Sequence, residues 1–134
     1  MTDRGDRFDH PLLERYASKE MAGLFSPRMR HGTWRDLWIA LAQAEHELGF
    51  PVAKEQIDEL RQHRDTFDWQ RVADLEKELR HDVMAHVHAY GDVAPKAKAI
   101  IHLGATSCYV VDNTEQIQMV QSLELVQSKL VVLM

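Results

Sequence analysis

Apolar residues near the end of the chain repeat with a helical period, and this pattern constrains the fold more than any other feature. Its spacing alternates between four and three residues, at Met119, Leu123, Val126, Leu130 and Leu133. Such a seam is typical of a coiled coil or of a long helix in a bundle. No capping glycine, proline or polar tail follows it. We therefore expect the front of a longer protein, or a chain that assembles with others to cover its seam.

Helical periodicity also marks the segments before this seam. Apolar residues recur at helical spacing over 34–48, with Thr33 as the expected N-cap, and over a shorter stretch, 52–63. A third run covers 69–90 and is interrupted by the charged sequence "LRHD" at 79–82. Both a break there and an unbroken helix fit the periodicity. Because no segment shows a convincing run of strands, the predicted fold class is all-α.

Charge and composition exclude several classes of partner. The net charge is −5 over 134 residues, without a cluster of Lys and Arg, which argues against a groove for nucleic acid. The first ten residues are charged and lack an apolar core, so we expect neither a secretory signal nor a membrane span. Cys108 is the single cysteine, in keeping with a reducing compartment. A cytoplasmic protein is expected.

The chain has eight histidines, yet their spacing does not predict a metal site. On a helix, His81 and His88 share a face while His86 points away, which is not the arrangement that helices use for zinc. Cys108 has no second cysteine beside it. With His102 as a base it could act as a nucleophile, but no family signature supports this. We expect Cys108 to be buried as a small apolar residue.

Two charged clusters are candidates for binding a phosphate or a carboxylate. Arg80 could bind such a group bidentately, His81 could add a donor, and Asp82 could orient either or hold a ribose hydroxyl. Arg15 beside Tyr16 also suits phosphate recognition. Both clusters fit a merely solvated surface as well.

The stretch "IHLGATSCYVVDN", residues 101–113, is a third candidate. Gly104 permits a tight turn, and Thr106 or Ser107 can cap a following helix. The free N–H groups of the first helical turn, together with the two hydroxyls, would form a neutral cradle for an anion. A cap without a ligand is the alternative. Asp112 with Glu115 also matches a capping box, which would start the helix later.

Three motifs in this order carry a resemblance to a known family. "RYAS" at 15–18, "LRHDVMAHVH" at 79–88 and the 101–113 stretch resemble the N-terminal region of the adenylosuccinate lyases, in the fumarase/aspartase superfamily. The match runs from Pro11 to the end of the chain. The "CY" after "TS" indicates the animal-like subgroup rather than the commoner bacterial pattern.

The resemblance implies a cytoplasmic, homotetrameric, all-α enzyme of purine biosynthesis, with active sites shared between subunits. Residues 1–111 would form its N-terminal helical domain, and 112–134 the start of a long bundle helix that can begin near 107. The enzyme would eliminate fumarate from adenylosuccinate, giving AMP, and from succinylaminoimidazole-carboxamide ribotide, without a cofactor or metal. The principal acid and base lie beyond Met134, so the 134 residues alone are expected to be inactive.

The resemblance also implies roles for individual residues, all in substrate binding. The phosphate would be contacted by Arg15 and Tyr16. The nucleotide would be contacted by Arg80, His81 and Asp82. The succinyl group would be contacted by Thr106 and Ser107. His81 is also a candidate for assisting proton transfer. The alternatives are a non-catalytic helical oligomerisation module and another lyase of the superfamily.

Overall fold

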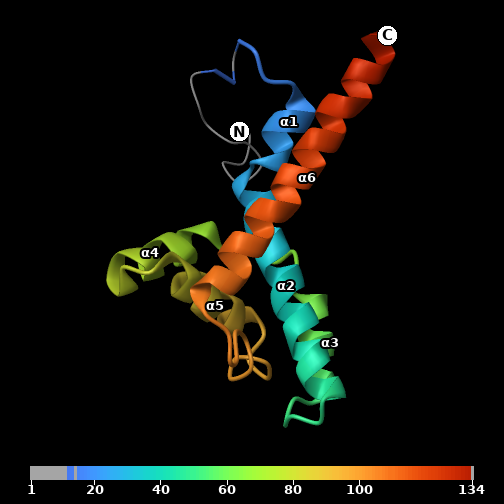
Figure 1. The fold of residues 1–134 in the computed structure, drawn as a ribbon. Helices are drawn as coiled ribbons and strands as arrows, with labels where there is room; N and C mark the ends of the chain where they lie inside the picture. Colours follow the sequence, from blue (N-terminus) through green and yellow to red (C-terminus); the bar gives the residue numbers. More distant parts are fainter. Residues whose placement is uncertain (1–11, 14, 134) are drawn as a thin grey trace.

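The computed structural model describes residues 12, 13 and 15–133, and over these residues it contains six helices and no strand (Figure 1). The all-α prediction is therefore confirmed. The helices are α1 (Lys19–Leu24), α2 (Pro27–Glu47), α3 (Lys54–Gln62), α4 (Trp69–Leu79), α5 (Asp82–Val93) and α6 (Ser107–Leu133). Figure 1 shows α6 crossing the molecule from beside α5 past α2 and α1. None of the helices in the described residues is long and apolar enough to span a membrane.

Helix α2 begins earlier than the sequence pattern predicts. The Ser26 side chain accepts a hydrogen bond from the Met29 N–H at 3.2 Å, and Pro27 occupies the first turn. Serine as N-cap followed by proline is a favoured helix start, because proline lacks the N–H that would otherwise be unpaired. The prediction of Thr33 as N-cap is wrong: Thr33 lies inside α2, and its hydroxyl donates to the Met29 carbonyl at 2.9 Å.

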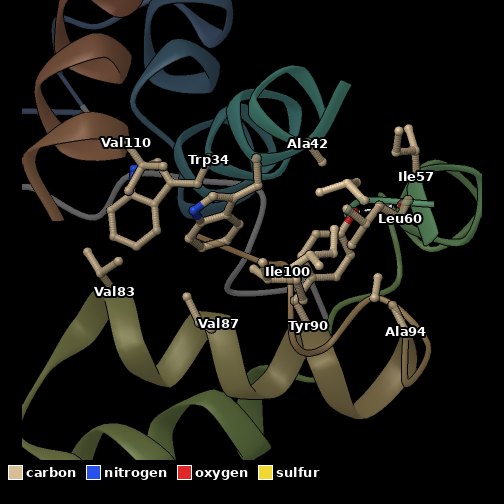
Figure 2. Close-up of a cluster of buried hydrophobic side chains, with 14 residues drawn as sticks. Trp34, Ala42, Ile57, Leu60, Val83, Val87, Tyr90, Ala94, Ile100 and Val110 are labelled. Carbon is tan, nitrogen blue, oxygen red and sulfur yellow. Dashed lines mark hydrogen bonds between the residues drawn. The ribbon is translucent and has the colours of Figure 1, made fainter. Parts of the chain in front are cut away.

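The hydrophobic core lies where α2, α3, α5 and the start of α6 meet. Figure 2 shows side chains from all four helices pointing toward one another, among them Trp34, Ile57, Leu60, Val83, Tyr90 and Val110. Each such apolar side chain contributes about 1.5–3 kcal/mol when fully buried. Tyr90 also needs a partner for its hydroxyl, which donates to the Leu60 carbonyl at 2.6 Å. This bond ties α5 to α3.

The charged interruption at residues 79–82 is a break between two helices. Asp68 caps α4, and Arg80 ends it in the left-handed conformation, with φ 51° and ψ 38°. Helix α5 then packs beside α4, with Val72 and Leu75 facing Ala85 and Ala89. Of the two alternatives left by the periodicity, the broken helix is the one observed.

Helix α6 begins at Ser107, so the later start suggested by Asp112 is not used. Its first part is buried against the rest of the chain at Val110, Thr114 and Gln118, and the Gln118 amide donates to the Leu24 carbonyl at 2.7 Å. Its second part is different. The five seam residues from Met119 to Leu133 are all exposed, and Figure 1 shows this end of α6 projecting beyond the other helices.

Candidate functional site

The break between α4 and α5 presents three of the predicted site residues together. Arg80, His81 and Asp82 line an open hollow of about 470 Å³ with Glu76. All three are exposed, because the helix ends at Arg80 and restarts at Asp82. The Asp82 carboxylate accepts from the Val83 N–H at 2.7 Å, as suits an acidic residue in the first turn of a helix.

His81 connects this break to the start of α6. Its Nδ1 accepts from the Met84 N–H at 3.3 Å, as the N-cap of α5. A neutral imidazole with an accepting Nδ1 carries its proton on Nε2. This Nε2 lies 3.3 Å from the Ser107 Oγ, so it is the donor and the serine oxygen accepts. The Ser107 hydroxyl proton is then left to donate to another acceptor, such as an anionic ligand.

Two clusters that are separate in the sequence, residues 80–82 and residues 106–107, are therefore adjacent in the structure. We call them together the His81–Ser107 group. Thr106 lies directly before Ser107 and is exposed, and its carbonyl accepts from the Tyr109 N–H at 2.9 Å in the first turn of α6. Gly104, with φ 66°, supplies the expected turn. The Ser107 hydroxyl at the start of α6 thus adjoins the imidazole of His81.

His102 is a neighbour of this group whose role the sequence leaves undecided. The Trp38 indole N–H donates to its Nδ1 at 3.0 Å. Burial lowers the pKa of His102, and the nearby His81 lowers it further. Nothing in the sequence pairs residues 38 and 102, because the contact depends on how the loop after α5 folds back onto α2.

Arg15 and Tyr16 lie apart from the His81–Ser107 group. Both are exposed, and Tyr16 lines a separate apolar hollow of about 320 Å³ with α1 residues such as Met21. Helix α1 packs on α6 near Gln118, which is about 16 Å along the helix from Ser107. Within this chain the structure therefore does not bring the two predicted binding clusters together.

The cysteine and histidine candidates lie in different surroundings. Cys108 is exposed, so the prediction that it is buried is wrong; α6 turns this position to solvent and Val110 inward. His86 is buried and stacks on His31, with ring centroids 3.9 Å apart. Within the described part of the chain, no three His, Cys, Asp or Glu side chains converge as metal ligands.

The left-handed backbone of Arg80 gives a stability prediction. A residue with a Cβ pays about 1–2 kcal/mol in this conformation, whereas glycine does not. Arg80→Gly and Arg80→Ala both remove the side chain, but only glycine relieves the backbone. We expect Arg80→Gly to be about 1 kcal/mol more stable than Arg80→Ala in urea denaturation, after allowing for the greater freedom of glycine in the unfolded chain. Equal stability, or a more stable alanine variant, would contradict the assigned backbone strain.

Comparison with known proteins places the chain among one group of enzymes. No family model matches it. Adenylosuccinate lyase of Schistosoma mansoni is 45% identical over 127 residues, covering 95% of this chain and 26% of the relative. The adenylosuccinate lyase of Saccharomyces cerevisiae is 46% identical over 129 residues, covering 94% and 27%. That of Schizosaccharomyces pombe is 47% identical over 134 residues, covering 98% and 28%.

The chain thus spans about a quarter of the length of the curated relatives it matches. Bacterial and archaeal adenylosuccinate lyases also match, at 31–36% identity. The higher identity to the eukaryotic enzymes agrees with the animal-like form of the "TSCY" sequence. The matched residues of this chain therefore belong to the adenylosuccinate lyase family, as its three motifs indicate.

Proposed function

We propose that the chain is the N-terminal part of an adenylosuccinate lyase that acts in purine biosynthesis in the cytoplasm. The enzyme eliminates fumarate from adenylosuccinate, leaving AMP, and from succinylaminoimidazole-carboxamide ribotide. Residues 1–111 form its N-terminal helical domain, and the later part of α6 begins its central bundle. The observation that carries the proposal is the pairing of His81 with Ser107, which joins two of the three family motifs in one group.

The proposed reaction explains what this group contributes. A base removes a proton from the carbon next to a carboxylate of the succinyl group, the C–N bond breaks, and the leaving nitrogen is protonated. Negative charge grows on that carboxylate as the proton leaves, so donors fixed beside it lower the barrier. Ser107, which accepts from His81 and keeps its own proton to donate, is such a donor, and Thr106 supplies a second hydroxyl.

The other predicted roles complete the binding of the nucleotide. Arg80, His81 and Asp82 contact the nucleotide from the hollow between α4 and α5, and His81 can assist proton transfer. Arg15 and Tyr16 bind the phosphate. The reacting acid and base come from residues beyond this chain, so the 134 residues alone bind part of the substrate and do not turn it over.

Assembly into a homotetramer is the second part of the proposal. The seam of α6 is exposed along Leu123, Val126 and Leu130, and an apolar stripe of this kind is stabilised by matching helices. Sharing of active sites between subunits would also unite Arg15 and Tyr16 with a His81–Ser107 group from another copy. Light scattering of the longer gene product after size exclusion tests the proposed homotetramer. A monomer at micromolar concentration would contradict it.

Turnover is the direct test of the proposed function. The longer gene product that carries these residues is expected to consume adenylosuccinate, followed by its absorbance, whereas the 134-residue chain is not. Consumption of argininosuccinate or fumarate in place of adenylosuccinate would show another lyase of the superfamily. A gene product that leaves all three unchanged would favour a helical oligomerisation module.

Replacing Ser107 tests the role of its hydroxyl. A hydrogen bond to a charged group is worth about 1.5–3 kcal/mol, so Ser107→Ala is expected to lower kcat/KM by about 10- to 100-fold in the longer gene product. The half-buried side chain contributes little to folding, and the melting temperature should stay nearly constant. Ser128→Ala is the matched control, because Ser128 lies on α6 and its hydroxyl donates to the Leu125 carbonyl in its own helix. Unchanged kinetics with a lowered melting temperature would mean that Ser107 acts only at the helix end.

A further inference from the structure

Trp38 makes a contact that the proposed roles do not use. Its side chain on α2 is only 1% exposed, and its indole N–H donates to the Nδ1 of His102 at 3.0 Å, with the two rings nearly perpendicular. An indole nitrogen can donate a hydrogen bond but cannot accept one. The Nδ1 of His102 must therefore be unprotonated, and a neutral His102 carries its proton on Nε2.

A second observation separates this contact from ordinary core packing. Trp34, one turn earlier on α2, is equally buried, yet its indole N–H has no hydrogen-bond partner among the described residues. The core therefore holds at position 34 a tryptophan whose indole N–H makes no hydrogen bond within the described part of the chain. At Trp38 it holds one whose N–H is aimed at the edge of an imidazole.

The backbone conformation of His102 also indicates that its contact with Trp38 serves a function. Its φ is 66°, a left-handed conformation that residues other than glycine rarely adopt. Such strain persists only where the surroundings hold the residue in place, and it gathers at functional sites. His102 begins the turn that leads through Gly104 to Ser107, and its ring is close enough to His81 for His81 to contribute to its lowered pKa.

We propose that Trp38 is a positioning residue for the His81–Ser107 group, because its indole N–H fixes His102 in the Nε2–H tautomer. The free edge of the His102 ring then presents a neutral donor, as the Nε2 edge of His81 does. Both rings have their Nδ1 occupied by a donor, from the indole in one case and from the Met84 N–H in the other. Only the relevance to catalysis rests on the proposed function; the tautomer follows from the contact.

Nitrogen NMR of the uniformly 15N-labelled chain tests the inference above the ordinary pKa of histidine. His102 is expected to show an unprotonated Nδ1 and a protonated Nε2, together with a scalar coupling through the hydrogen bond between the Trp38 and His102 nitrogens. In Trp38→Phe this signature should be lost, and the two ring nitrogens should shift toward the averaged values of an exchanging imidazole. In Trp34→Phe, the matched control, the His102 signature should remain.

Each result decides the matter without an activity assay. A protonated Nδ1 in the unaltered chain, or the absence of the coupling, overturns the proposal. The same holds if Trp38→Phe leaves the tautomer unchanged, or if Trp34→Phe disturbs it equally. If Trp38→Phe does not fold, the tautomer and the coupling in the unaltered chain still give the answer. If the His102 tautomer depends on Trp38 but the longer gene product shows no lyase turnover, this inference stands and the proposed function is wrong.

Discussion

Replacing Arg35 by Met is expected to destabilise the protein by about 4 kcal/mol, a large part of the stability of a domain of this size. Arg35 is only 2% exposed on α2. Its Nη1 donates to the carbonyls of His63, Arg64 and Thr66 at 2.8, 3.0 and 2.7 Å. Methionine fills a similar volume but donates nothing, so it would leave these carbonyls without their donor, at about 1–3 kcal/mol for each.

Two aromatic rings help to hold the guanidinium of Arg35, which forms no ion pair with a carboxylate in the described part of the chain. It lies 3.8 Å from the ring centroid of Phe67 and 4.1 Å from that of Tyr90. Burial lowers the pKa of Arg35 to about 10, so it remains charged at neutral pH, and cation–π attraction offsets part of the desolvation. Arg35 therefore links α2 to the loop before α4 through its hydrogen bonds, and to α5 through the ring of Tyr90.

Urea denaturation followed by circular dichroism measures the effect, with Arg61→Met as the matched control. Arg61 is exposed on α3 and pairs with Asp58 at 3.2 Å, and exposed ion pairs contribute about 0–1 kcal/mol. Arg35→Lys should fall between the two variants, since one ammonium keeps the charge but not the planar donor set. If Arg35→Met were as stable as Arg61→Met, the loop carbonyls would not depend on this side chain.

The fold class was predictable because each helix carries its own signals along the chain. Helical spacing of apolar residues located α2, α3 and α6, and it kept the break after Leu79 open as one of two alternatives. The ends of the helices were less predictable. Thr33 has the chemistry of an N-cap, but Ser26 and Pro27 start α2 first, and Thr33 is then satisfied inside the helix by the Met29 carbonyl.

The sequence singles out the residues of the candidate site, but their arrangement does not follow from it. His81 and Ser107 are 26 residues apart, and no periodicity relates them; they meet because α5 and α6 both begin at the same end of the core. The contact between Trp38 and His102 depends on a strained loop residue in the same way. Cys108 shows the converse error, since composition favoured burial while its position on α6 faces solvent.

Acid is expected to unfold the chain through a stacked pair of histidines, of which His86 is buried and His31 is half-buried. His31 on α2 and His86 on α5 lie face to face, and the Trp34 ring contacts both. Burial lowers the pKa of His31 to about 4, with a further contribution from Arg30. Burial also lowers the pKa of His86 to about 2, and His31 adds to the effect. Both rings are therefore neutral in the folded protein at neutral pH.

The sign of the effect follows from which state binds more protons. In the unfolded chain each ring takes up a proton as the pH falls through about 6.5. In the folded chain His31 resists protonation down to about pH 4 and His86 down to about pH 2. The unfolded state thus binds more protons in this window, and the free energy of unfolding falls by up to about 1.4 kcal/mol per pH unit for each ring. Between pH 6 and 4 the loss approaches roughly 5 kcal/mol.

His86→Phe isolates this contribution because phenylalanine keeps a flat ring in the stack and cannot be protonated. The free energy of unfolding, measured in urea at a series of pH values, should fall less steeply than in the unaltered chain, by up to about 1.4 kcal/mol per pH unit, which is the contribution of one ring. Carboxylates titrate alike in both proteins and cancel in the difference. His88→Gln, on the same helix, leaves the stacked pair intact and should keep the original slope. Parallel slopes for His86→Phe and the unaltered chain would assign the acid sensitivity to other groups.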